Sequence, residues 1–151
     1  MSADANHPHD GPSIAVSNRQ SLPVDEAALM ELASQTLIGE GALDADLSVS
    51  FVDDAEMEEL HVRYMDEPGP TDVLSFPIDD EADELDGRRM LGDVVIAPSV
   101  AAQNNPADPA AEMRLLLVHG ILHLLGSDHE GERERAAMWA KQERYSGVRA
   151  T

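Results

Sequence analysis

The spacing of hydrophobic positions changes several times along this chain of 151 residues, which separates predicted strands from predicted helices. Leu47, Val49 and Phe51 alternate with polar residues, a pattern typical of a strand with one buried face. The apolar run 94–96 has no polar interruption, which indicates a strand buried on both faces. We predict strands over residues 13–20, 47–53, 71–78 and 88–98.

Helices are indicated by their ends. The segment after Pro23 has acidic residues in its first turn and glycines at its end. Asp108 and Pro109 have the form of an N-cap and a first helical position. We predict helices over residues 24–41, 54–65, 98–104, 109–125 and 130–145. The acidic stretch 79–87 is predicted to be an exposed connection between two strands.

The order of these elements predicts the fold class. Strands and helices are mixed along the chain without an internal repeat, so we expect an α+β (mixed α/β) fold. A small mixed β-sheet of about four strands would pack with about five helices. We predict one domain over residues 13–146, between a flexible N-terminal tail at 1–12 and a C-terminal tail at 147–151.

Composition narrows the class of protein. The chain has no cysteine, which excludes disulfides and thiolate ligands and fits a reducing cytoplasm. No apolar run has the length of a membrane span, and the first residues lack the regions of a signal peptide, so we expect a cytoplasmic protein without a membrane partner. The formal net charge is −20 with a single lysine, Lys141, and such a field repels nucleic acid on average. A local cationic cleft is still compatible with this charge.

The stretch "HGILHLLGSDH" carries the clearest chemistry. His119 and His123 are four residues apart, so both imidazoles lie on one face of the predicted helix. Gly126 can then reverse the chain in a left-handed conformation and return His129 to the same point. Three imidazoles leave a fourth position open for water, as in catalytic zinc sites. We predict a metal site for one zinc ion per chain on this helix and the following turn, with the metal-bound water as its reactive group.

Gly120 stands where a zinc peptidase of the HExxH type has its glutamate. Without that general base a peptide is a poor substrate, whereas a phosphodiester has anionic oxygens that can accept a proton. The pattern therefore disfavours a peptidase and leaves phosphoester hydrolysis open. Asp128 is either a fourth ligand of a structural metal site or a partner that orients an imidazole, and the spacing does not decide between them.

Three motifs resemble those of one known family. "VHGILHLLGSDH" (118–129) resembles the signature H-G-x-L-H-L-x-G-x-D-H of the YbeY family of bacterial endoribonucleases. "PTDVLSFP" (70–77) and "LGDVVIAPSVA" (91–101) resemble the second and third hallmarks of that family. Their order and spacing also agree, so the resemblance covers roughly residues 13–145.

The resemblance implies a zinc-dependent endoribonuclease that is specific for single-stranded RNA. It implies a role in ribosomal RNA maturation, at the 3′ end of the small-subunit RNA, and in ribosome quality control. Ribosomal subunits or ribosome-assembly proteins would be partners, and the fold would be a small mixed sheet packed with helices. His119, His123 and His129 fall on the zinc-ligand positions of the family one by one.

The chain departs from the family pattern at two positions. The residue before Asp128 is usually tyrosine in the family and is Ser127 here. Many members have an arginine directly after the aromatic residue that corresponds to Tyr64, where this chain has Met65. The nearest arginine is Arg63, which either reaches the same space or is an ordinary surface charge.

Several polar residues outside the histidine motif have two interpretations. Alternation along the strand turns Ser75 either toward the site or toward solvent. Asp93 interrupts an apolar strand, so it needs a partner or an edge position. Arg88, Arg89 and Arg114 are candidates for a basic rim or ordinary surface charges. The candidate catalytic residues beyond the metal ligands are Arg63, Ser75 and Asp128.

Two other functions are compatible with the sequence. One is a metallopeptidase-like or other metal-dependent hydrolase, favoured by the histidine spacing and opposed by Gly120. The other is a non-catalytic, zinc-stabilised ribosome-assembly factor. For an endoribonuclease, two mechanisms are open: attack by a metal-bound hydroxide on phosphorus, or metal activation of the 2′-hydroxyl of RNA.

Overall fold

The computed structural model describes residues 11–66, 69, 71–78, 88–126 and 131–148 of the chain. These residues form four strands and five helices, which confirms the predicted α+β class. In chain order the elements are β1 (Ser13–Arg19), α1 (Glu26–Gly39), β2 (Ala45–Val52), α2 (Asp54–Met65), β3 (Val73–Pro77), β4 (Arg89–Ile96), α3 (Pro98–Asn104), α4 (Pro109–Leu124) and α5 (Glu132–Ser146). Each predicted element is present, and its ends differ from the predicted ones by no more than two residues. The predicted connection at 79–87 lies outside the described residues.

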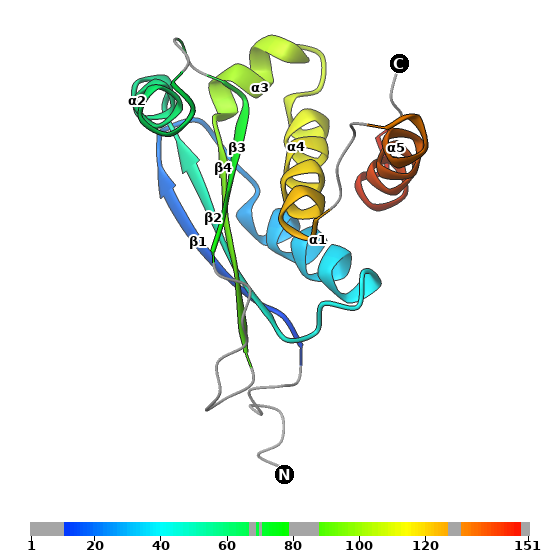
Figure 1. Cartoon of the computed structure of the whole chain (residues 1–151). Helices are drawn as coiled ribbons and strands as arrows, with labels where there is room; N and C mark the ends of the chain where they lie inside the picture. The colour runs from blue at the N-terminus through cyan, green and yellow to red at the C-terminus, as the bar shows by residue number, and fades with distance from the viewer. Residues whose placement is uncertain (1–10, 67–68, 70, 79–87, 127–130, 149–151) are drawn as a thin grey trace.

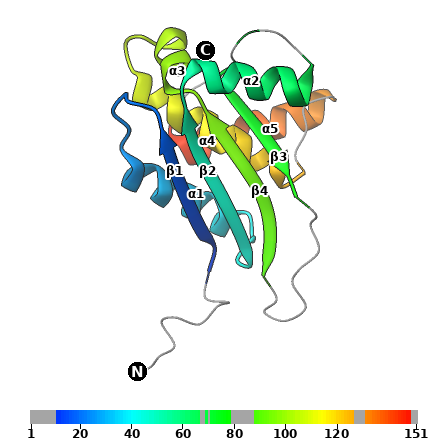
Figure 2. The same ribbon diagram turned by 90° about the vertical axis from the view of Figure 1, so that its left-hand side faces the viewer.

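The sheet has the strand order β1–β2–β4–β3 (Figure 2). β1, β2 and β4 run parallel, and β3 pairs antiparallel with β4 at one edge, so the sheet is mixed as predicted. In the antiparallel pair, Ser75 lies opposite Val94, and Phe76 lies opposite Asp93. Side chains alternate along a strand, so Ser75 and Val94 point to one face of the sheet while Phe76 and Asp93 point to the other.

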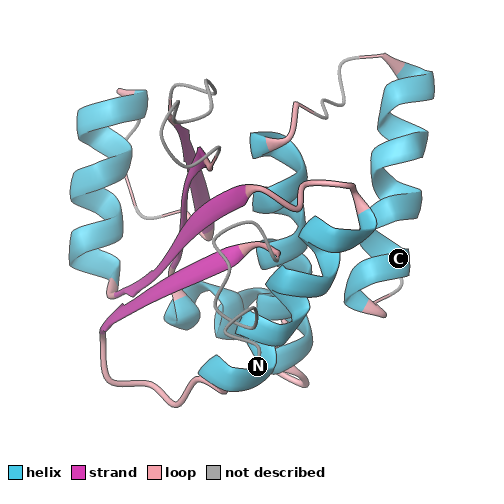
Figure 3. Cartoon of the chain, turned by 90° about the horizontal axis from the view of Figure 1, so that it is seen from below, coloured by secondary structure: helices cyan, strands magenta, loops and turns pink. Residues whose placement is uncertain are grey.

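Helices cover the two faces of the sheet unequally (Figure 1). α1 and α4 pack against one face, α5 packs on α4, and α2 lies on the opposite face. Figure 3 shows the same layers from below, with α2 on one side of the strands and the larger group of helices on the other. The main core lies under α1 and α4 and includes the fully buried Val49, Phe51, Val94, Ile96 and Leu117. Within the described ranges, none of the helices has the length and apolar character of a membrane span.

Local signals in the sequence explain where α4 begins and ends. The side chain of Asp108 accepts a hydrogen bond from the backbone N–H of Ala111, and Pro109 begins the first turn, as predicted for an N-cap. The helix ends at Leu124, and Gly126 follows with a φ angle of +95°. That conformation favours glycine, as predicted for Gly126, and residues 127–130 after it lie outside the described residues.

Candidate active site

Two of the predicted metal ligands lie side by side on α4. The imidazole rings of His119 and His123 are half-buried, with their centroids 4.5 Å apart and their planes inclined at 67°. Their positions one helical turn apart follow from the four-residue spacing. The third predicted ligand, His129, and the neighbouring Asp128 lie outside the described residues. In the described part of the chain, no three histidine or carboxylate side chains form a metal-binding group, so the structure brings together two of the three predicted ligands.

A residue of α5 orients the first of these imidazoles. Nδ1 of His119 lies 2.6 Å from Oε1 of Gln142, a residue that is only 4% exposed. The amide oxygen accepts, so Nδ1 carries the ring proton and Nε2 carries the lone pair. Metal-binding histidines commonly have such an acceptor behind them, which fixes the ring orientation. The sequence interpretation missed Gln142, although its spacing from the equally buried Met138 and Ser146 indicates one inward face of α5.

Gly120 is buried where α4 packs on the sheet. A Cβ atom at this position would lie 2.8 Å from Cγ1 of Val94 and 3.1 Å from Oγ of Ser75. Protein interiors do not accommodate such short distances, so even alanine here would push α4 away from β4. A glutamate would need still more room and would carry its charge into the core. Packing therefore explains why the residue after His119 is not the general base of a peptidase.

Ser75, one of the candidate catalytic residues, lies on the α4 side of β3. Its hydroxyl donates to the carbonyl oxygen of Gly120 at 3.2 Å, and its side chain is half-buried. Of the two orientations that strand alternation allowed, the structure shows the one toward α4. This hydrogen bond joins the edge strand β3 to the helical turn that carries His119. The observed role of Ser75 is therefore to hold β3 and α4 together.

Arg63, another candidate, lies on the exposed side of α2. Its Nη2 is 3.2 Å from Oε1 of Glu59, and its guanidinium carbon is 6.0 Å from the centroid of the Tyr64 ring. The helix continues to Met65, so Arg63 is held on the helix surface. No hydrogen bond or ion pair joins Arg63 to α4 in the described residues.

The three arginines considered for a basic rim have different environments. Arg88 is only 8% exposed and pairs with Asp46 at 2.7 Å, so it is neither a rim residue nor a surface charge. Arg114 donates from Nε to the carbonyl oxygen of Ser146 at 3.2 Å. Arg89 lines a cavity of about 380 Å³ near the end of α4, and its buried Nε has no hydrogen-bond partner among the described residues. Arg114 lines a smaller cavity of about 90 Å³ near the start of α4, so Arg89 is the arginine of the three whose cavity lies at the end of α4 that carries His123.

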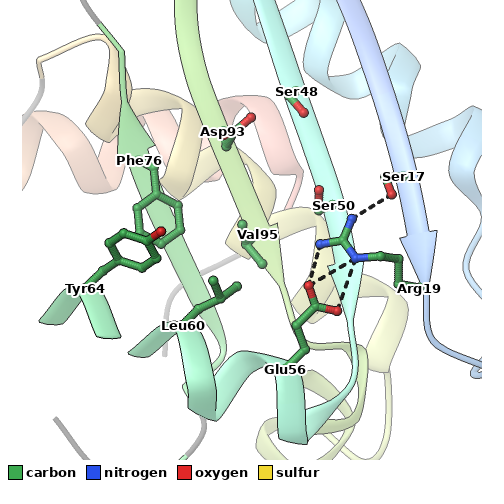
Figure 4. Close-up of a pocket in the computed structure, with 10 residues that line it drawn as sticks. All are labelled: Ser17, Arg19, Ser48, Ser50, Glu56, Leu60, Tyr64, Phe76, Asp93 and Val95. Carbon is green, nitrogen blue, oxygen red and sulfur yellow. Dashed lines mark hydrogen bonds and ion pairs between the residues drawn. The ribbon is translucent and has the colours of Figure 1, made fainter. Parts of the chain in front are cut away.

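The opposite face of the sheet carries a polar cavity of about 510 Å³ (Figure 4). Ser48 and Ser50 enter it from β2, Asp93 from β4, Phe76 from β3 and Tyr64 from α2. The sequence predicts either a partner or an edge position for Asp93, but β4 is an inner strand and Asp93 makes no hydrogen bond in the described structure, so neither is found there. The structure shows it half-buried in the wall of this cavity.

An ion pair closes one side of the same cavity. Nε of Arg19 lies 3.1 Å from both carboxylate oxygens of Glu56, and Nη2 lies 2.7 Å from one of them. Hydrogen bonding to Glu56 raises the pKa of Arg19 above its usual value, and Nη1 also donates to Ser17 at 2.8 Å. The charges of Arg19 and Glu56 compensate each other. The carboxylate of Asp93 therefore gives the described lining of the cavity a net negative charge.

Comparison with known proteins identifies the family. The family model described as endoribonuclease YbeY matches residues 15–147. The endoribonuclease YbeY of Leifsonia xyli subsp. xyli is 46% identical over 138 residues, which cover 86% of this chain and 90% of that protein. The endoribonuclease YbeY of Thermobifida fusca is 47% identical over 143 residues, which cover 86% and 89%.

A solved structure agrees with this assignment. The solution structure of TM1509 from Thermotoga maritima matches with a TM-score of 0.57 and 26% sequence identity. The match covers 88% of this chain and 86% of that one, so it extends over most of both folds. With the family model and the relatives spanning most of its length, this chain belongs to the endoribonuclease YbeY family.

Proposed function

We propose that this chain is a zinc-dependent endoribonuclease that cleaves single-stranded RNA. The observation that carries the proposal is the imidazole pair of His119 and His123, with Gln142 behind the first ring. Family membership supports the nuclease class, and the imidazole pair supports a metal as the source of reactivity.

The side chains at this site fit a zinc ion. Imidazole nitrogens suit zinc, and the hydrogen bond from His119 to Gln142 is the kind of outer support that metal-binding histidines have. We propose His119, His123 and His129 as the ligands of one ion per chain. Bound there, zinc would supply positive charge beside the scissile phosphate and lower the pKa of water to about 7.

The residues of the chain itself divide the remaining work. Gln142 holds the proton on Nδ1 of His119 and thereby keeps Nε2 as the donor atom. Gly120 lets α4 approach the sheet closely. This close packing fixes the position of both imidazoles relative to the edge strand β3. Because packing excludes a carboxylate after His119, we assign the role of proton acceptor to a phosphate oxygen of the substrate.

For the substrate in the cell, we propose ribosomal RNA at the 3′ end of the small-subunit RNA. Ribosomal subunits or ribosome-assembly proteins would be partners, and the cytoplasm would be the location. The support is the resemblance of three separate motifs, at 70–77, 91–101 and 118–129, to one family. The net charge of −20 opposes RNA binding at long range, so the contact depends on positive charge at the metal centre itself.

The test combines metal analysis with a substrate panel. Protein purified without a histidine tag should contain about one zinc ion per chain and cleave single-stranded RNA, but neither duplex RNA nor peptides. Chelation should remove the activity and added zinc should restore it. A metal-free protein with full activity would contradict the zinc centre. Peptide cleavage would favour the metallopeptidase alternative, and bound zinc without any hydrolysis would favour a non-catalytic assembly factor.

A further inference from the structure

The polar cavity and the imidazole pair lie on the two sides of one edge strand. Ser75 of β3 points toward α4 and bonds the carbonyl oxygen of Gly120, which directly follows His119. The next residue, Phe76, points to the opposite face and lines the cavity. β3 is an edge strand, so a single strand of RNA that passes along this edge reaches both sides.

Three polar side chains of the cavity make no hydrogen bond to any residue that the structure describes. Asp93 and Ser48 make no hydrogen bond in the described structure, and neither does Ser50, which is only 9% exposed. Their side-chain oxygens are not among the buried atoms without a partner in the described structure, so each of them is open to solvent at the cavity. These three side chains therefore present unused hydrogen-bonding capacity to whatever enters the cavity.

Aromatic rings form the wall beside the edge strand. The ring of Tyr64 lies 5.2 Å from that of Phe76, edge to face at 66°, and Tyr64 is 56% exposed. An exposed ring supported by a second ring is a platform on which a nucleobase stacks. The cavity volume of about 510 Å³ is in the range of small-molecule sites.

The charge of the cavity selects the kind of group that fits. Arg19 is engaged by Glu56, so the carboxylate of Asp93 is not compensated by a cation in the cavity. A phosphate would be repelled, whereas a neutral group with N–H donors would be attracted. A carboxylate presents two acceptor oxygens side by side, which matches two neighbouring N–H donors. Guanine has such a pair at N1 and N2 of its Watson–Crick edge, whereas adenine has a donor beside an acceptor.

We propose that this cavity binds a guanine base of single-stranded RNA. The base stacks on Tyr64, its N1–H and N2–H groups donate to Asp93, and Ser48 and Ser50 bond its other polar atoms. The backbone of the same strand then passes the edge of β3 toward His119. This inference rests on the proposed endoribonuclease function, because it concerns how that site selects its substrate.

Binding of free nucleosides tests the cavity separately from RNA cleavage. The full chain, labelled with ¹⁵N, is titrated with guanosine or with adenosine, and NMR shifts of the backbone amides of Ser48, Ser50 and Val95 are followed. Guanosine should shift these amides, and adenosine should bind more weakly. In Asp93→Asn the affinity for guanosine should fall about ten-fold, and adenosine should become the better ligand, because an asparagine amide matches the donor–acceptor pair of adenine.

A matched control makes the same chemical change outside the cavity. Asp66→Asn removes one exposed carboxylate at the end of α2, where asparagine tolerates the left-handed conformation (φ 55°), and should leave the preference for guanosine unchanged. If Asp93 had only a structural role, Asp93→Asn would lower the affinity for guanosine and for adenosine equally. Absence of shifts at the cavity with guanosine, or an unchanged preference in Asp93→Asn, would overturn the proposal.

Cleavage of short single-stranded RNAs separates this inference from the proposed function. Oligonucleotides that carry one guanosine, moved along an otherwise adenosine and uridine sequence, should be cut at a fixed distance from it. In Asp93→Asn the cut should no longer lie at a fixed distance from the guanosine, but cleavage itself should be retained. Cleavage without any dependence on guanosine would contradict the base site alone. No cleavage of any RNA, with guanosine still bound at the cavity, would contradict the function alone.

Discussion

The two faces of the sheet are built from the same strands, yet they differ in almost every physical respect. On the covered face, Val94 and Ile96 are fully buried, and Gly120 lets α4 pack directly on Val94. On the open face, Ser50 and Asp93 line a cavity of about 510 Å³ without hydrogen-bond partners in the described structure. Neighbouring residues of one strand produce this contrast, since Asp93 and Val94 point in opposite directions.

The contrast shows that one small fold can hold two imidazoles rigidly on one side of the sheet and expose polar side chains to solvent on the other. The imidazoles of His119 and His123 are supported by a packed helix that has no room for one further methyl group at Gly120. The open face has polar side chains that line a cavity and make no hydrogen bond to other described residues. Substitutions on the covered face should therefore disturb the fold or the metal centre, whereas substitutions of the polar cavity residues Ser50 and Asp93 should disturb neither.

Glutamate in place of Gly120 should have the largest effect on stability. Its Cβ would collide with Val94 and its carboxylate would be buried, so the free energy of unfolding should fall by about 3 kcal/mol or more. Urea denaturation measures the loss. As a control, Ala110→Glu adds the same side chain to the exposed first turn of α4 and should change stability by about 0.5 kcal/mol or less. A stable Gly120→Glu protein that hydrolyses peptides would refute the packing explanation.

Removal of Gln142 should have the next largest effect, on the metal centre. In Gln142→Ala the ring of His119 loses its acceptor, and zinc affinity should fall about 10- to 100-fold. Competition with a chelator gives the dissociation constant, and circular dichroism checks the fold. Gln142→Glu retains both the acceptor and the volume and should retain the affinity, whereas Gln142→Met retains the volume alone and should lose it, which a purely packing role would not predict. The exposed Gln35→Ala is the matched control, and an equal loss there would contradict a specific role of Gln142.

A pair of hydroxyl substitutions compares the two faces most closely, with smaller effects. Val94→Thr places a hydroxyl in the covered core at nearly constant volume and should lower the free energy of unfolding by about 1 to 3 kcal/mol. Ser50→Ala removes a hydroxyl from the open face and should change it by about 0.5 kcal/mol or less, since that hydroxyl makes no bond in the described structure. Both values come from chemical denaturation. Equal losses would mean that the open face is packed like the covered one.

The sequence predicted the elements because their signals are local. Alternation at Leu47, Val49 and Phe51 specified β2, and Asp108 with Pro109 specified the start of α4. The pairing of His119 with His123 also needed only the helical period. Each of these signals is contained within one element, so no knowledge of the tertiary arrangement was necessary.

Contacts between distant elements were beyond the sequence interpretation. The acceptor behind His119 comes from α5, 23 residues further along the chain. The polar cavity requires the strand order β1–β2–β4–β3, which brings Ser50 and Asp93 together. Arg88 was considered for the surface and is buried because Asp46 of the neighbouring strand pairs with it. In each case the missing information was which elements lie side by side.

The rate of RNA cleavage by His123→Ala, measured with its zinc content, tests the central claim most directly. Loss of an outer partner of a metal ligand already costs about 10- to 100-fold, so loss of the ligand itself should lower both zinc occupancy and cleavage rate by more than about 100-fold. The fold should persist, because α4 packs through its apolar face. His61→Ala on α2 is the matched control and should keep both zinc and activity. Full cleavage by a folded His123→Ala protein without zinc would contradict the proposed metal centre.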